Sequence, residues 1–165
     1  MGSTNPHYEA DLTAIKYNTN KIIIRPRGLN IVWGKDGRYW NVPTQGSGVD
    51  KPAELLQVCW LEVTGFVDTN PDKNYEVTFR LSLTPDAFGW SGSTIYIMVK
   101  RGKDGEFESK KYDLTKYGTE EFNLTMKSTK SNQTDRKLYF GLYEVWSGKW
   151  KGGLKIHHVT VGEES

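Results

Sequence analysis

The residues of this chain best suited to chemistry are aromatic side chains beside short polar turns. Trp33 and Trp40 flank the turn 34–38, and Tyr39 stands directly before the second tryptophan. Large aromatic faces are costly to leave in water unless a partner covers them. Flat rings beside a few hydrogen-bonding groups suit the alternating C–H faces and hydroxyl edges of a sugar. The pattern therefore predicts a carbohydrate-binding surface.

Two further segments combine aromatic residues with glycine-containing turns. Near the C-terminus, Trp150 follows the turn 147–149, and the loop 85–92 carries Phe88 and Trp90. We expect Trp150 to flank the same cleft as the first cluster. The loop with Phe88 and Trp90 is expected either to close over a long oligosaccharide or to pack against a partner subunit.

Each candidate in the first cluster has a structural alternative. Trp40 is predicted to be the stacking platform under a sugar ring, and the alternative is a tryptophan that plugs one end of the fold. Trp33 is expected either to stack on sugar or to belong to the core. Tyr39 is expected to cap the sugar ring edge with its hydroxyl group, or to be an ordinary strand residue. Arg38 is expected to donate to sugar hydroxyls, or to be an exposed turn residue without a role.

Glu144 is the predicted acidic contact of the sugar. It lies in an otherwise apolar alternation, and a carboxylate in such a place needs a hydrogen-bonding partner. That partner is expected to be a sugar hydroxyl or an acetamido N–H. Lys149, Lys151 and Arg38 are the alternatives within the protein.

Catalytic and metal chemistry have weaker support in the sequence. Glycoside hydrolysis needs two carboxylates that span the scissile bond. Asp36, Asp86 and Glu144 are available, but no pattern supports any pair of them. His157 and His158 are adjacent, so on a strand they point to opposite faces and do not make a metal site. We therefore predict a binding protein with no catalytic residues, no metal and no cofactor.

Composition restricts the classes of function. The chain has 165 residues, 36% hydrophobic and 25% charged, so we expect one soluble domain with its own core. The formal net charge of +2 is too small to make nucleic acid the main partner, which leaves it as a secondary possibility. A single cysteine, Cys59, excludes an internal disulfide. No apolar run is long enough to cross a membrane and the start does not resemble a signal peptide, so the expected location is a reducing, cytosol-like compartment.

Strand signals dominate the chain, with apolar and polar residues alternating between turns rich in Gly, Pro, Asn and Asp. The predicted inward positions are Leu29 and Ile31; Tyr75, Val77, Phe79, Leu81 and Leu83; Ile95, Ile97 and Val99; Leu138, Phe140 and Leu142; and Leu154, Ile156 and His158. Only 52–56 reads as a helical turn. The pattern predicts an all-β protein, an antiparallel β-sandwich that is jelly-roll-like.

Side-chain parity links the aromatic clusters to this sandwich. Trp33 continues the inward parity of Ile31, and Glu144 and Trp146 continue that of Leu142. Alternate positions of a strand face the same side. These residues are therefore expected to emerge on the core side where each strand leaves the sandwich, at the rim of a groove.

The segment 58–67 carries apolar residues on both faces. Cys59 shares the cleaner apolar face with Leu61, so we expect an inert core thiol. Trp60 lies on the other face. It is expected to pack against the protein or to meet a partner subunit rather than to bind a ligand.

Four sequence blocks, in order, resemble one plant family. They are LNIVWGKDGRYW (29–40), AELLQVCWLEVTG (53–65), KNYEVTFRLSLT (73–84) and LYEVWSGKWKGGLKIHHV (142–159). The pattern resembles the phloem protein 2 superfamily, also called the Nictaba-like lectins. The start HYEA (7–10) looks closest to the phloem-exudate lectins of cucurbits.

The resemblance implies a β-sandwich lectin without catalytic activity. Members bind N-acetylglucosamine oligomers (chitooligosaccharides) and the chitobiose cores of N-glycans, and the family residues implicated in sugar binding fall on Trp33, Trp40 and Glu144. Relatives are nucleocytoplasmic or phloem-borne and often dimeric, so a homodimer of the cytoplasm or phloem sap, with a role in plant defence, is expected. The alternative is a structural or transport protein of the phloem that carries protein or RNA cargo.

The resemblance also implies a division of the chain. Residues 27–161 are expected to form the lectin domain, with 1–26 as an N-terminal extension packed on it and 162–165 as a tail. Two departures from the family stand out. Gly28 occupies a position where relatives usually carry an acidic residue, and the loop 44–51 is enriched in glycine and polar residues.

Overall fold

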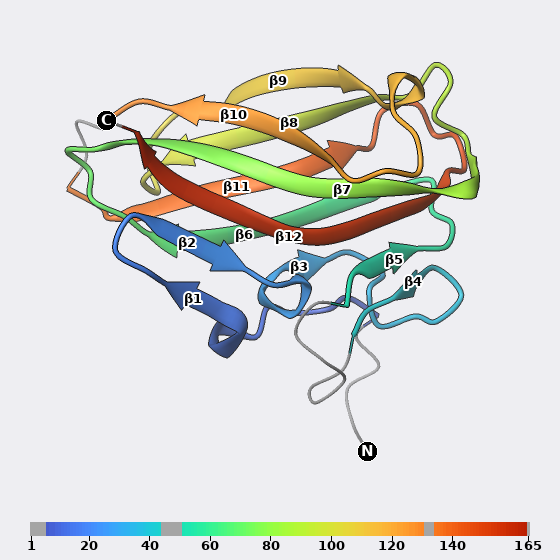
Figure 1. Ribbon diagram of the computed structural model, residues 1–165, viewed down its shortest axis with the longest axis horizontal. Helices are drawn as coiled ribbons and strands as arrows, with labels where there is room; N and C mark the ends of the chain where they lie inside the picture. Colours follow the sequence, from blue (N-terminus) through green and yellow to red (C-terminus); the bar gives the residue numbers. More distant parts are fainter. Residues whose placement is uncertain (1–5, 44–50, 131–133, 165) are drawn as a thin grey trace.

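The fold consists of two antiparallel β-sheets stacked face to face (Figure 1). The computed structural model describes residues 6–43, 51–130 and 134–164, so nearly all of the unusual loop 44–51 lies outside the described residues. The helical segments of the described part are three short 3₁₀ turns, Leu12–Ala14, Pro26–Gly28 and Leu114–Lys116. Within that part, no helix has the length and apolar character needed to span a membrane. The predicted all-β antiparallel sandwich is confirmed.

The longest strands, β7 (Asn74–Phe88) and β12 (Gly152–Glu164), are neighbours in the larger sheet. The other edge of β12 pairs first with β5 and then with β2. The remaining members are β1 (Ile15–Tyr17), β2 (Lys21–Ile24), β4 (Trp40–Asn41), β5 (Ala53–Leu55) and β10 (Phe122–Ser128). In this seven-stranded sheet β1 pairs with β2, β4 with β5, and β10 with β7.

The smaller sheet lies on the other side of the core. Its five strands follow the order β3 (Asn30–Ile31), β6 (Leu61–Asp68), β11 (Lys137–Glu144), β8 (Thr94–Arg101) and β9 (Glu108–Asp113). In Figure 1 β7 and β12 run in front of β6 and β11. Strands from both ends of the chain therefore contribute to each sheet.

The alternating apolar positions form the core between the sheets. The predicted inward residues of β7, β8 and β11 are all buried, as are Leu29, Ile31, Leu154 and Ile156. Phe79 and Phe140 meet across the interior with ring centroids 5.9 Å apart. Gly65 makes room for this contact, because a Cβ there would lie 2.7 Å from the ring of Phe140. The period-two pattern thus identified the packed faces correctly.

The segment predicted as a helical turn, 52–56, is a strand instead. Ala53 and Leu55 are buried and Glu54 is half-buried, which is strand alternation. This strand, β5, is hydrogen-bonded to β12 on one side and to β4 on the other. Strand partners distant in sequence outweighed the helical preference of its residues.

Two inward assignments beside bridges and bulges are also corrected. A register shift lies between Ile156 and His158 in β12, so that Val159 takes the buried position predicted for His158. Cys59 is only half-buried, so it is not a core thiol. Val58 takes the buried position there because its backbone forms a bridge with Lys151.

Candidate functional site

Three aromatic rings gather at the surface where the turn before β4 meets the loop 144–151, which connects β11 to β12. Trp33, Tyr39 and Trp150 form this edge cluster. The ring centroids of Trp33 and Tyr39 are 5.7 Å apart with an interplanar angle of 64°, and those of Tyr39 and Trp150 are 6.3 Å apart at 29°. Trp33 is 37% exposed and Trp150 is 51% exposed. The two turn segments expected to meet in space do meet, and they share one accessible aromatic surface.

Trp33 owes its exposed position to an unusual backbone conformation. Its φ of 68° is the only positive value at a non-glycine residue in the described part of the chain. This left-handed conformation costs an L-residue roughly 1–2 kcal/mol. The chain turns here directly after β3, so the side chain leaves the core side and the predicted inward parity is wrong. Backbone strain of this kind is concentrated at functional sites.

The N-terminal segment supports this conformation. The backbone N–H of Trp33 donates to Nδ1 of His7 at 2.9 Å, and the two rings lie 5.3 Å apart in an edge-to-face arrangement. The next residue, Gly34, packs so closely that a Cβ would lie 2.7 Å from Cβ of Tyr8. No local sequence pattern indicates this role for His7, because the contact joins residues 26 positions apart.

A hollow of about 460 Å³ lies beside the same turn. Its lining includes Tyr8, Asp11, Arg27, Gly34, Lys35, Gly37, Trp40 and Asn41. Arg27 and Asp11 form an ion pair in it, with Nη1 and Oδ2 2.8 Å apart. The turn therefore has a hollow with an ion pair in it next to the exposed rings.

Trp40 is not the exposed platform that the sequence predicted. It is 2% exposed, lies on β4 opposite Leu55, and belongs to the core. Because Asn41 takes the outward position of this short strand, the indole of Trp40 faces inward. A sealed ring has no face to offer a sugar, so the structural alternative holds and Trp40 closes the end of the fold.

Glu144 also has a structural role in place of the predicted sugar contact. It is 2% exposed, and its Oε1 lies 3.0 Å from Nζ of Lys151, a fully buried side chain. The hydroxyl and backbone N–H of Ser147 both donate to the same carboxylate. The alternative partner Lys151 is therefore the correct one, and the carboxylate is occupied by the protein itself.

The Glu144–Lys151 pair anchors the loop 144–151, which carries Trp150. Besides the carboxylate, Nζ of Lys151 donates to the carbonyl oxygens of Cys59 at 3.1 Å and Lys149 at 2.7 Å, which uses all three of its donors. Burial raises the pKa of Glu144, but the hydrogen bonds from Ser147 and Lys151 outweigh it, and the net pKa is lowered. The carboxylate is thus charged at neutral pH and holds both ends of the segment 144–151.

Arg38 lies at the surface above the edge cluster. Its Nε and Nη2 donate to Asp36 at 3.0 and 2.7 Å, and its guanidinium lies 5.1 Å from the ring centroid of Tyr39. Hydrogen bonds from the side chain and backbone of Arg38 lower the pKa of Asp36 to about 2. The guanidinium is held over an aromatic face, where it can donate to a ligand on that ring.

The loop with Phe88 and Trp90 divides its two rings. Trp90 is buried and its Nε1 donates to the carbonyl oxygen of Gly152 at 3.1 Å, so it is corrected to a core residue. Phe88 is 45% exposed and lines a hollow of about 420 Å³. Gly89, with φ of 84°, allows the loop 85–92 to pack against the loop 144–151, since a Cβ there would lie 2.1 Å from the carbonyl oxygen of Trp150. Phe88 is therefore the ring of this loop that a ligand or partner can reach.

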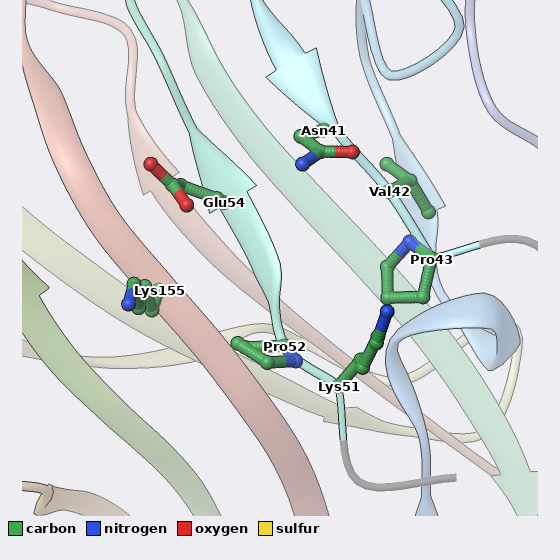
Figure 2. A pocket seen from close by; sticks show the side chains of 7 residues that line it. All are labelled: Asn41, Val42, Pro43, Lys51, Pro52, Glu54 and Lys155. Atoms are coloured by element: carbon green, nitrogen blue, oxygen red, sulfur yellow. The ribbon is translucent and has the colours of Figure 1, made fainter. Parts of the chain in front are cut away.

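A hollow of about 460 Å³ opens on the outer face of the larger sheet (Figure 2). Glu54 lines it and lies opposite Asn41 on β4 and Lys155 on β12. No aromatic ring is among its described lining residues. Elsewhere too, the described residues include no group of three His, Cys, Asp or Glu side chains placed to hold a metal ion. The exposed aromatic rings thus mark the edge cluster as the candidate site.

Comparison with protein families identifies the chain. The family model described as Phloem protein 2 matches residues 19–162. This chain belongs to the phloem protein 2 family. It is 41% identical over 176 aligned residues to Protein PHLOEM PROTEIN 2-LIKE A9 of Arabidopsis thaliana, an alignment that covers 95% of this chain and 96% of that protein. Over 77 residues it is 39% identical to a protein of Luffa acutangula named Lectin, covering 44% of this chain and 37% of the lectin.

Solved structures share the fold of this phloem protein 2 family member. A β-(1,4)-mannanase of Podospora anserina, described as GH26-CBM35, superposes with a TM-score of 0.53 and 8% identity, covering 90% of this chain and 28% of that one. A family 35 carbohydrate binding module from Clostridium thermocellum superposes with a TM-score of 0.50 and 14% identity, covering 87% and 98%. At such low identity the likeness shows the β-sandwich fold alone.

The family match contains the whole edge cluster. Trp33, Tyr39 and Trp150 all lie within residues 19–162, whereas His7, which supports Trp33, lies before them. The strands β1 and β2, placed by sequence in an N-terminal extension, pair with each other and with β12. The first strands of the chain are thus integrated into the larger sheet.

Proposed function

We propose that this phloem protein 2 family member is a lectin that binds N-acetylglucosamine oligomers, and the chitobiose cores of N-glycans, at the edge cluster. The observation that carries the proposal is the accessible assembly of Trp33, Tyr39 and Trp150. The name of the Luffa acutangula relative supports a carbohydrate ligand. The N-acetylglucosamine specificity rests on the resemblance of the sequence blocks to the Nictaba-like lectins.

The geometry suits binding by stacking with polar anchoring. Tyr39 and Trp150 lie within 29° of parallel, and Trp33 meets Tyr39 at 64°, so the cluster offers rings in more than one orientation. Arg38 supplies donors above the ring of Tyr39. Aromatic stacking of a nucleic-acid base is worth about 1–3 kcal/mol, and the C–H face of a sugar gains somewhat less. Useful affinity therefore requires several stacked units of one oligomer, or two sites joined in a homodimer.

Binding without cleavage completes the proposal. The carboxylate of Glu144 is committed to Lys151 and Ser147, and Asp36 is committed to Arg38. Neither has the independence that a glycosidase acid or nucleophile needs. Chitotetraose incubated with the protein should remain intact, and shorter products would contradict the proposal. The relatives named as phloem proteins support phloem sap as the place of action.

Titration calorimetry with chitotriose tests the site directly. Trp150→Ala should weaken binding at least tenfold, because it removes the ring of the edge cluster that is 51% exposed and lies against Tyr39. The matched control is Phe107→Ala, which removes a ring that is 55% exposed on a different loop. Equal affinity in wild type and Trp150→Ala would refute the edge cluster as the sugar site.

A further inference from the structure

A second group of aromatic rings lies on the outer face of the five-stranded sheet, apart from the edge cluster. Trp60, Tyr96, Tyr143 and Trp146 form this sheet platform. Tyr143 of β11 lies directly opposite Glu62 of β6 and Tyr96 of β8, and Tyr96 lies opposite Lys111 of β9. One continuous row, Glu62–Tyr143–Tyr96–Lys111, therefore crosses four neighbouring strands.

Tyr143 lies down on the sheet instead of standing up from it. Its ring occupies the space above Gly141, since a Cβ on that glycine would lie 2.5 Å from Cε2 and 2.8 Å from the hydroxyl oxygen of Tyr143. Any larger residue at position 141 would push the ring away. Burial and the nearby Glu62 carboxylate raise the pKa of Tyr143, so its hydroxyl group remains a donor at neutral pH. The centre of the face is thus a flat ring with a polar edge.

Two exposed tryptophans flank this flat ring. Trp60 is 45% exposed and its Nε1 donates to Oε1 of Glu62 at 2.9 Å. Trp146 is 58% exposed and meets Tyr96 edge to face, with ring centroids 4.8 Å apart. Each indole is held in place by a residue of the row, although neither is covered. Contiguous exposed aromatic surface of this kind marks an interaction site.

We propose that the sheet platform is a second carbohydrate-binding surface, which takes an extended glycan chain laid across β6, β11 and β8. The inference rests on the proposed lectin function and extends it to a second face. The row spans three strand spacings, roughly 14 Å, which is longer than one sugar ring. Flat rings at the centre of the row and charged hydrogen-bonding groups at both ends, Glu62 and Lys111, match the faces and edges of a sugar chain.

The platform and the edge cluster are linked by one connecting loop. Trp146 and Trp150 both belong to the segment anchored by Glu144 and Lys151, yet Trp146 contacts Tyr96 on the sheet face and Trp150 contacts Tyr39 at the edge. The same loop therefore contributes one tryptophan to each surface.

The charges on this face argue against a second copy of the chain as its occupant. A two-fold symmetric contact places the same patch against itself, and the cores of such contacts are depleted in charged residues. Lys100 and Lys137 lie over aromatic rings of the same outer face, and Lys111 ends the row. A self-contact would have to bury these lysines and Glu62, whereas a sugar chain can accept hydrogen bonds from the lysines and donate to the carboxylate.

The tryptophans divide into three pairs that make the test direct. The chain has six of them. Trp33 and Trp150 belong to the edge cluster and Trp60 and Trp146 to the sheet platform, while Trp40 and Trp90 are buried and serve as internal controls. The indole N–H signals, assigned by single Trp→Phe variants, are followed by NMR during titration with chitohexaose, cellohexaose and xylohexaose. We expect the Trp60 and Trp146 signals to move with at least one hexasaccharide.

Variants separate the two surfaces. In Trp33→Ala, the shifts of Trp60 and Trp146 should persist. In Trp60→Ala, the shift of Trp146 should require at least tenfold more hexasaccharide, while Trp33 and Trp150 respond as in wild type. Because Trp60 lies outside the loop 144–151, its removal should leave the ion pair between Glu144 and Lys151 in place.

The outcomes distinguish this inference from the proposed function. Movement of Trp33 and Trp150 alone would overturn the platform and leave the edge site standing. Movement of Trp60 and Trp146 alone would overturn the edge site and support the platform. Signals that stay still for every hexasaccharide would overturn both. A dimer in sedimentation velocity that Trp60→Ala converts to a monomer would assign the face to a second copy and overturn the proposal.

Discussion

The turn 33–40 and the connecting loop 144–151 both hold indole rings in water, and they do so by different means. At the turn, Trp33 is exposed through a left-handed backbone supported by His7 and Gly34. At the loop, a buried ion pair closes the segment and both Trp146 and Trp150 are exposed. The first device is mainly backbone geometry, and the second is electrostatic and lies inside the protein.

The difference shows how one residue type can be given opposite roles. Trp40 continues from the same turn as Trp33 but enters β4, where the strand directs it inward. No strand receives Trp146 or Trp150, because β11 ends at Glu144 and β12 begins at Gly152. For Trp40, Trp146 and Trp150, the position relative to strand ends therefore separates the packed ring from the exposed ones.

The largest expected effect comes from removing one partner of the Glu144–Lys151 ion pair, which anchors the loop 144–151. Lys151→Met leaves the buried carboxylate of Glu144 unpaired, so we expect the free energy of unfolding to fall by about 3–5 kcal/mol. Adding Glu144→Leu should restore most of this loss, because both charges are then gone. Urea denaturation measures both changes, with Lys149→Met as the exposed control. A loss as large in the control would show that the anchor has no special role.

The contrast between the two tryptophans of the turn predicts a separation of stability from binding. Trp40→Ala should cost about 3–5 kcal/mol of folding free energy while the folded fraction keeps its affinity for chitotriose. Trp33→Asn should change stability by less than about 1 kcal/mol, since Asn tolerates the left-handed conformation, and should weaken binding at least tenfold. Denaturation and calorimetry on both variants check this. The reverse pattern would return the platform role to Trp40.

The smallest expected effect is the pH dependence of the stability that the Glu144–Lys151 ion pair provides. The folded pKa of Glu144 is lowered, so its contribution to stability is complete above the unfolded value of about 4.3 and is lost as the pH falls through the lower folded value. The difference in unfolding free energy between wild type and Glu144→Gln should therefore be constant near neutral pH and shrink below about pH 4. A difference that grows on acidification would contradict the lowered pKa.

Much of the fold followed from alternation alone. The segment 75–83 was assigned as a strand with the correct buried face, because its core positions repeat at period two over a long stretch. The helical turn predicted for 52–56 is wrong, because the strand β5 is short and obtains its hydrogen bonds from the separate strands β12 and β4. The inward position predicted for His158 is wrong because no local sequence signal indicates the register shift between Ile156 and His158.

The candidate site was predicted in part. The meeting of Trp33 with Trp150 near Tyr39 was expected from aromatic residues beside glycine turns, and the geometry brings them together. Trp40 and Trp90 carry the same local signal, but their strand or loop turns them into the core. Composition around a turn shows that an aromatic residue is near the surface, and it does not show which way the ring points.

The sequence by itself determined the sandwich, its packed faces and the family, because it contains both the period-two alternation and the four family-like blocks in order. Only the tertiary structure decided which rings face water. That choice depends on where strands end, on the backbone sign at Trp33, and on a buried bond between Glu144 and Lys151. The same holds for Tyr143, whose ring lies flat in the space that a side chain at Gly141 would occupy.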